Sequence, residues 1–191
     1  MQERGHTLLE MLAVVAIILI TASAAIPHLK AYAVEAHLLA AGRVFKGEFM
    51  KARSIAVRSR VQTAIRFENG PLGPSYSVYM DGNHNGVLSS DIAAGRDRRI
   101  AGPLELNAGA ADVHVGINPG VPAIPPDSGT LDPADAIRFG ASNMVSFSPL
   151  GTATPGTFYL AGEGLQGAVR VTGGTARVRL MVCRGRTWVE R

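Results

Sequence analysis

Apolar residues are concentrated in one stretch near the start of the chain. Residues 8–26 are interrupted only by Glu10, Thr21 and Ser23. About 20 residues of helix, rising 1.5 Å per residue, match the hydrocarbon thickness of a bilayer. The pattern therefore predicts one membrane-spanning helix ahead of a globular domain. Pro27 follows directly and is predicted to kink the helix, because proline removes a backbone donor and clashes with the preceding turn.

Beyond Pro27 the pattern changes to helical spacing and then to short strands. Apolar residues recurring every three or four positions predict that the helix continues to about Arg58 and packs one face on a sheet. We assign to that face Leu29, Tyr32, Ala33, Ala36, Leu39, Ala40, Ala52, Ile55 and Ala56. Runs rich in β-branched and aromatic residues predict strands over Val61–Phe67, Tyr76–Met80, Asp112–Ile117, Met144–Ser148, Thr157–Ala161, Ala168–Thr172, Arg177–Cys183 and Thr187–Glu190. The expected fold class is α+β, a long N-terminal helix on antiparallel sheet.

The segment Gly116–Asp135 is rich in proline, with Pro119, Pro122, Pro125, Pro126 and Pro133. Proline cannot donate to a ladder of strand hydrogen bonds, so this segment is excluded from a central strand. We expect a mobile loop that contacts a partner.

Composition limits the function classes. The chain has 191 residues, of which 47% are hydrophobic, enough for one modest domain and an appendage. A net charge of +4 lies far below that of dedicated nucleic-acid binders, and the single Cys183 excludes an internal disulfide. No nucleophile motif, metal-ligand spacing of histidines or phosphate-binding glycine loop is present, so we predict that the protein is not an enzyme.

Glu10 is the most unusual residue of the apolar stretch. A carboxylate inside a membrane helix costs about 2.5–3.5 kcal/mol on insertion scales, so it is kept where it finds a partner. Glu10 is therefore predicted to be functional.

The residues Arg4 to Met11, read as Arg-Gly-His-Thr-Leu-Leu-Glu-Met, resemble the prepilin processing motif: Gly, usually Phe, then Thr-Leu-Leu-Glu. The resemblance implies that a prepilin peptidase cleaves after Gly5 and methylates the new N-terminus at His6, which replaces the usual Phe. It divides the chain into a leader (1–5), a transmembrane and assembly helix (6–27) and an extracytoplasmic pilin-like domain (28–191). Glu10 becomes the fifth mature residue, which in this family meets a neighbouring subunit's N-terminal amine during assembly.

Two further segments resemble the group of minor pseudopilin H and FimT-like proteins: Lys51–Ala56, and Phe147–Gly151 followed by Pro155–Thr157. The resemblance implies a structural subunit of a type II secretion pseudopilus, which supports protein export across the outer membrane. It further implies a single-pass inner-membrane location with the domain in the periplasm. The implied partners are other pseudopilins or pilins, the prepilin peptidase, the inner-membrane assembly platform and membrane lipid.

Two alternatives to the secretion role remain open. One is a FimT-like minor pilin of a type IV pilus that binds DNA during uptake, and the other is a membrane-anchored periplasmic ion-binding domain.

The ion-binding alternative rests on residues 81–86, Asp-Gly-Asn-His-Asn-Gly. Oxygen side chains at the first, third and fifth positions followed by glycine are typical of a calcium loop. The twelfth position is Ile92 instead of Glu, so we favour a long turn without a cofactor. The Ca²⁺ ligands of the alternative would be Asp81, Asn83, Asn85 and Asp91.

The DNA-binding alternative rests on Arg177, Arg179, Arg184 and Arg186. Arg177 and Arg179 alternate with apolar residues, so a strand would project both from one face, where they could contact phosphates. FimT-like proteins carry Gly-Arg-x-Arg here, whereas this chain has Ala176 in place of the glycine. We favour a solvated strand face, because charged residues are mostly exposed without a partner.

Overall fold

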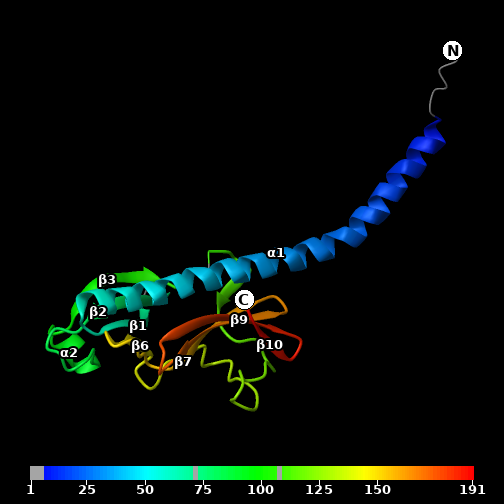
Figure 1. The fold of residues 1–191 in the computed structure, drawn as a ribbon. Coiled ribbons are helices and arrows are strands. Elements are labelled where there is room, and N and C mark those ends of the chain that lie inside the picture. The colour runs from blue at the N-terminus through cyan, green and yellow to red at the C-terminus, as the bar shows by residue number, and fades with distance from the viewer. Residues whose placement is uncertain (1–6, 71–72, 107–108) are drawn as a thin grey trace.

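The computed structural model describes residues 7–70, 73–106 and 109–191 (Figure 1). Its first element is α1, Leu8–Ser59, a helix of 52 residues. Thr7 caps the N-terminus: its backbone is extended, and its Oγ1 accepts a hydrogen bond from the Glu10 amide at 3.3 Å. Arg60 ends the helix in the left-handed conformation, with φ of 56°. The predicted end near Arg58 is therefore correct to within a residue or two.

The N-terminal part of α1 projects away from the rest of the chain, and the helix axis curves before it reaches the domain (Figure 1). Pro27 lies inside α1, which is not interrupted there. The assignment of the bend to Pro27 stays a prediction.

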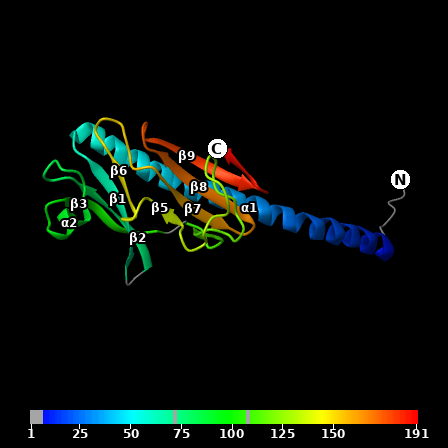
Figure 2. The same ribbon diagram turned by 90° about the horizontal axis from the view of Figure 1, so that it is seen from below.

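The strands form two antiparallel sheets under the C-terminal part of α1 (Figures 1 and 2). The first sheet has the order β3-β2-β1-β6, with β1 Thr63–Gly70, β2 Gly73–Met80, β3 Arg98–Glu105 and β6 Met144–Phe147. The second has the order β10-β9-β8-β7-β4, and β5 also pairs with β7. Its strands are β4 Val113–Val115, β5 Ile137–Arg138, β7 Gly156–Gly162, β8 Leu165–Thr172, β9 Arg177–Arg184 and β10 Thr187–Glu190. A short helix, α2 Ser89–Ala93, connects β2 to β3.

The predicted fold class is confirmed: the chain is α+β, with one long helix on antiparallel sheets, consistent with a pilin-like fold. Each predicted strand is present, Thr187–Glu190 with the predicted ends and the others with shifted ends, but β3, β5 and α2 were not predicted.

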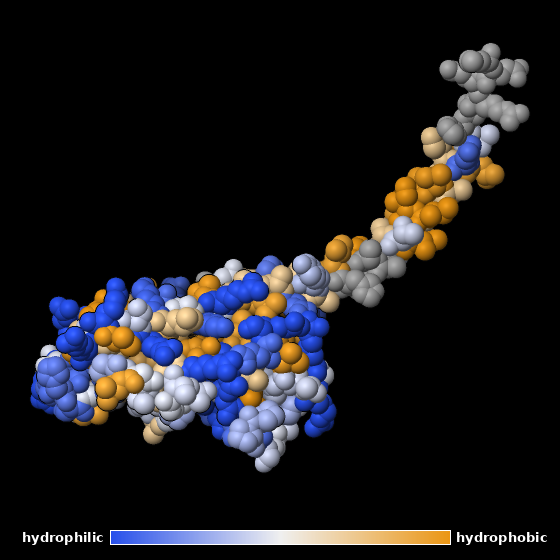
Figure 3. Space-filling view, in the orientation of Figure 1, coloured by the Kyte–Doolittle hydropathy of each residue, from blue (hydrophilic) through white to orange (hydrophobic). Residues whose placement is uncertain are grey.

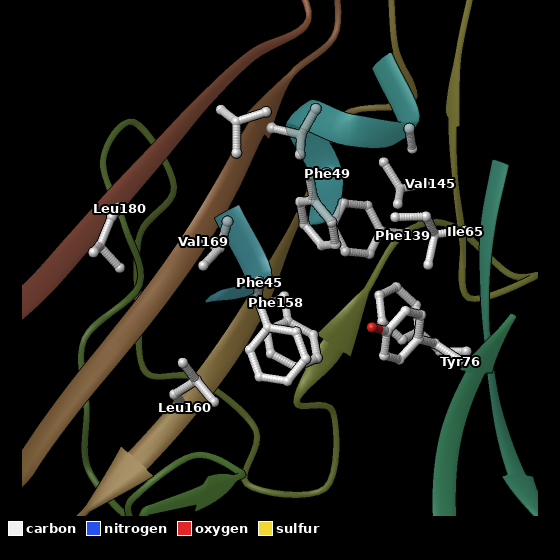
Figure 4. Packing of buried hydrophobic residues seen from close by; sticks show 14 of the residues in the cluster. Phe45, Phe49, Ile65, Tyr76, Phe139, Val145, Phe158, Leu160, Val169 and Leu180 are labelled. Atoms are coloured by element: carbon white, nitrogen blue, oxygen red, sulfur yellow. The ribbon is translucent and has the colours of Figure 1, made fainter. Parts of the chain in front are cut away.

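Aromatic side chains join the helix to both sheets (Figure 4). Phe45 packs against Phe158 in a tilted arrangement with ring centroids 4.5 Å apart, and Phe49 meets Phe139 edge-on at 5.7 Å. Phe67 of β1 contacts Phe158 of β7 at 5.5 Å, so rings from the two sheets meet below the helix. Burial of these rings supplies much of the apolar area that stabilises the domain.

The predicted packing face of α1 is partly wrong. Leu29, Tyr32, Ala36 and Ala40 are exposed, whereas Ala52 and Ala56 are buried as expected. The face that packs on the sheets comprises Val34, Leu38, Ala41, Phe45, Phe49, Ala52 and Ala56. Gly42 lies on this side, and a Cβ there would clash with Leu180 of β9, so glycine allows the helix to approach the strand.

The proline-rich segment is packed against the second sheet, and its mobility stays a prediction. Ile117, Ile124 and Leu131 form a small second core with Tyr159, Ala168 and Met181, on the side of the sheet away from α1. The indole Nε1 of Trp188 donates to the Pro122 carbonyl at 2.9 Å. The expectation that these prolines avoid a central strand is correct, since the segment has only an isolated bridge between Pro122 and Thr130.

The predicted membrane span over residues 6–27 is not confirmed. Within residues 7–70, 73–106 and 109–191, no helix combines the length and apolar character that a membrane crossing requires.

Candidate functional site

The processing motif leads directly into the first turn of α1. Gly5 and His6 lie outside the described residues. Thr7 is the N-cap and Glu10 is the third residue of the helix. Thr-x-x-Glu at these positions has the spacing of a capping box, and a carboxylate in the first turn is favoured by the helix dipole. The side chain of Glu10 is exposed. It is therefore placed both to support the helix start and to reach a second molecule.

The N-terminal part of α1 exposes most of its large apolar side chains (Figure 3). The exposed fractions run from 48% at Val14 to 82% at Leu8. The set comprises Leu8, Leu9, Met11, Leu12, Val14, Val15, Ile17, Ile18, Leu19, Ile20 and Ile26. A contiguous apolar surface of this extent marks a site of contact with protein or lipid. We call these residues the free apolar segment.

A second apolar surface continues along the solvent side of α1 above the domain. Leu29, Tyr32, Val44, Met50 and Val57 are each at least half exposed. Sequence reasoning missed this surface, because it assigned Leu29 and Tyr32 to the packed face. We call these five residues the outer stripe.

The candidate calcium residues form one closely bonded loop, but their oxygens accept N–H groups. Asp81 Oδ1 accepts from the amides of Asn83 and His84 at 3.0 and 2.7 Å, and its Oδ2 accepts from Gly86 at 2.8 Å. Asp91 Oδ2 accepts from the side-chain amides of Asn83 and Asn85, each at 2.9 Å. A calcium site instead needs oxygens that converge on the ion.

The same loop is closed by a third carboxylate and an arginine. Asp97 accepts from the amides of Gly82 and Leu88 at 3.1 and 2.9 Å, and Arg96 Nε donates to Asp91 Oδ1 at 3.0 Å. The hydrogen bonds from Arg96, and then from the two asparagines, lower the pKa of Asp91 to about 2. In the part of the chain that the structure describes, no group of three or more His, Cys, Asp or Glu could hold a metal. The hydrogen bonds are those of a long turn closed by N–H donors, and the expectation that the loop needs no Ca²⁺ stays a prediction.

The four candidate DNA-binding arginines do not share one face. Arg177 Nη2 binds Glu190 Oε1 at 2.9 Å, at the outer side of β9 and β10. Arg184 instead forms an ion pair with Glu35 of α1. Arg179 lies beside Arg177 on the outer side, and Arg186 lies in the exposed turn between β9 and β10. Only Arg177 and Arg179 are brought together as predicted.

The segment Phe147–Gly151 forms a tight turn that presents Leu150. The Gly151 amide donates to the Ser148 carbonyl at 3.1 Å, and the Leu150 amide donates to Ser148 Oγ at 3.1 Å. Gly151 has φ of 85°, a conformation that favours glycine. Leu150 is 91% exposed at the tip, so the turn fixes an apolar side chain in solvent.

Comparison with known proteins supports the motif at the N-terminus. A family model described as the prokaryotic N-terminal methylation motif matches residues 1–26. No curated protein and no solved structure matches the chain. The motif, which leads into a long helix packed on antiparallel sheets, supports a type IV pilin-like protein. Such a motif implies a membrane-anchored protein that is processed by prepilin peptidase and assembles with other pilins, in a structural rather than an enzymatic role.

Proposed function

We propose that this chain is a minor pseudopilin, a structural subunit of a type II secretion pseudopilus in the inner membrane and periplasm. The observation that carries the proposal is the free apolar segment. A helix that exposes so many apolar side chains needs contact with lipid or neighbouring subunits, and it begins at a methylation motif. The choice of the secretion system rests on the resemblance at residues 51–56 and 147–151.

In this proposal, the subunit is cleaved after Gly5, methylated at His6 and packed by its free apolar segment among other helices of a filament. Contact with lipid or with neighbouring helices keeps these side chains out of water, where exposed apolar area costs about 25 cal/mol per Å². No enzymatic turnover is involved. The Glu10 carboxylate pairs with the N-terminal amine of a neighbour, which brings two opposite charges together in an apolar environment.

The DNA-uptake alternative receives no specific support from the arginines. Arg184 is paired with Glu35 and Arg177 with Glu190, so two of the four charges are partly neutralised within the chain. A phosphate backbone needs several accessible cations along one face.

The experiment deletes the gene and compares the exoproteins in the medium with those retained in the periplasm. We expect retained exoproteins in the deletion strain and release after complementation with the wild-type chain. An unchanged secretome would contradict the secretion role.

Variants of Glu10 separate its two potential roles. Gln is acceptable at the third position of a capping box but carries no charge. We therefore expect Glu10→Gln, like Glu10→Ala, to be processed but not incorporated into filaments. Glu35→Ala is the matched control, because Glu35 lies on the same helix but is paired with Arg184. Normal assembly of Glu10→Gln would assign Glu10 to helix capping alone.

A further inference from the structure

A cleft of about 620 Å³ lies on the side of the second sheet that faces away from α1. Its lining includes Arg138, Arg170 and Arg179 together with Pro125 and Pro126. Arg138 and Arg170 were not among the candidate site residues of the sequence analysis.

Strand register places the three arginines in one row. Arg138 of β5 pairs with Thr157 of β7, Thr157 pairs with Arg170 of β8, and Arg170 pairs with Arg179 of β9. Directly paired residues project from the same side of a sheet, which places all four on the cleft side. Like charges directly opposite one another, as Arg170 and Arg179 are, destabilise a sheet. An anion between them would remove that repulsion.

Two of the three guanidinium groups already have close acceptors. Arg138 Nε lies 3.1 Å from Asp135 Oδ2. Arg170 Nη1 donates to the Ile124 carbonyl at 3.1 Å, and its Nη2 lies 3.4 Å from Asp127 Oδ2. The proline-rich segment therefore supplies the acceptors that hold Arg170 in place.

Arg179 differs from both. Its Nη1 is 3.9 Å from Glu190 Oε2, and the other oxygen of that carboxylate is bound by Arg177 at 2.9 Å. Its Nε is buried and has no hydrogen-bond partner among the described residues. A buried donor without an acceptor costs about 1–3 kcal/mol, so Arg179 is the least satisfied of the three guanidinium groups. Its side chain is partly exposed, and that exposed part is what a ligand in the cleft can contact.

We propose that this cleft binds one carboxylate of an extended acidic peptide segment of a partner protein, with Arg179 as the principal contact. A carboxylate presents two acceptors in a plane, which match the guanidinium fork. Pro125 and Pro126 are exposed and offer an apolar wall for the peptide. The proposal does not depend on the pseudopilus assignment.

The surrounding charges favour a single carboxylate over a nucleic acid. Asp127 and Asp135 line the cleft, and a Glu190 carboxylate oxygen lies 3.9 Å from Arg179 Nη1. These carboxylates would repel the successive phosphates of a polyanion, whereas one incompletely paired guanidinium matches one negative charge.

The test is an NMR titration of the full ¹⁵N-labelled chain in zwitterionic detergent micelles, following the arginine Nε–H signals. The probes are acetyl-Gly-Glu-Gly-amide, its Gln analogue, and the Gln peptide with a free C-terminal carboxylate. We expect the Glu peptide to shift the Arg179 signal saturably and the amidated Gln peptide to bind about tenfold or more weakly, because a charged hydrogen-bond acceptor is lost. Binding of the free-terminus Gln peptide at least as tightly as the Glu peptide would assign the site to a C-terminal carboxylate, and weaker binding would assign it to an acidic side chain.

Variants and a competitor complete the test. Arg179→Gln should weaken binding of the Glu peptide by about tenfold or more, and Arg179→Lys should weaken it less because the charge remains. Arg186→Gln is the control and should leave binding of the peptide unchanged. Unchanged thermal unfolding of each variant shows that the domain is intact. Equal binding of both amidated peptides, or full binding by Arg179→Gln, would overturn the proposal. A single-stranded oligonucleotide that displaces the Glu peptide and binds more tightly at the same salt concentration would also overturn it and assign the cleft to nucleic acid.

Discussion

At the scale of single residues, Asp91 shows how N–H donors stabilise a buried carboxylate in a loop of polar side chains. The Arg96 guanidinium and the amides of Asn83 and Asn85 bind its charged form, which lowers its pKa from 3.8 to about 2. A carboxyl whose pKa is lower in the folded state contributes stability above its unfolded pKa, and that contribution is lost as pH falls through the folded pKa. The loop is therefore held by a carboxylate that stays ionised well below neutral pH.

We expect Asp91→Asn to lower the melting temperature above pH 4, because it removes the charged acceptor. The difference from the wild-type chain should shrink between pH 4 and pH 2, as the wild-type carboxyl is itself protonated. Circular dichroism melts across this pH range provide the measurement. Glu163→Gln is the control, since Glu163 is in an exposed pair with Lys30 and should have little effect. A pH-independent difference for Asp91→Asn would contradict the account.

Phe49 tests how much a buried aromatic side chain of the core contributes to the free energy of unfolding. It is 1% exposed and meets Phe67, Phe139 and Phe158 with ring centroids within 6.3 Å. We expect Phe49→Ala to lower the free energy of unfolding by about 3–5 kcal/mol, as large-to-small aromatic substitutions do. Met50→Ala, one residue along on the exposed side, should change it by about 0.5 kcal/mol or less. Chemical denaturation measures both, and similar losses for the two variants would place the core elsewhere.

At the scale of elements, α1 contains one glycine, Gly47, that close packing on the sheets does not require. A Cβ on Gly47 would meet no atom within 4 Å, unlike one on Gly42. Gly47 is exposed to solvent and lies well away from both ends of the helix. Glycine in such a position costs about 0.5–1 kcal/mol relative to alanine. We expect Gly47→Ala to raise the free energy of unfolding by that amount, whereas Gly42→Ala should lower it because of Leu180. A destabilising Gly47→Ala would show that the helix backbone is more closely covered there than the structure indicates.

The helix and most strands were predictable because their patterns are local. The side of α1 that packs on the sheets was not predictable, because apolar residues recur at helical spacing on two sides of the helix. Leu29 and Tyr32 lie three residues apart on the exposed side, and Val34 and Leu38 lie four apart on the buried side. The β3 strand was missed because Arg98–Glu105 is mostly exposed at a sheet edge and contains Pro103, so it lacks the alternation of a buried strand.

The candidate sites also divide into those that a local sequence pattern predicts and those that only the fold brings together. Glu10 is found from sequence because a charge in an apolar stretch is a local anomaly. The cleft is not, because Arg138, Arg170 and Arg179 come from three strands that only the register of the second sheet aligns. The Asp81–Asp91 segment resembled an ion loop because hydrogen-bonded Asx turns and calcium loops use the same residue types.

At the scale of the whole molecule, the domain and the free apolar segment are separable. Among the described side chains, burial begins at Val34, so the core uses no residue of the N-terminal projection. We expect a chain that begins at residue 29 to fold with a melting temperature within a few degrees of the full chain, as a differential scanning measurement would show. An unfolded truncated domain would mean that the N-terminal part of α1 stabilises the fold as well as mediating assembly.

The central claim is that the chain is a processed pilin-like filament subunit, and mass spectrometry of its N-terminal peptide in the filament fraction tests it most directly. The account predicts a peptide that begins at His6 and carries one methyl group, recovered together with other pilin-like subunits. A chain found only in the membrane fraction with Met1 intact would contradict both the processing and the assembly that we propose.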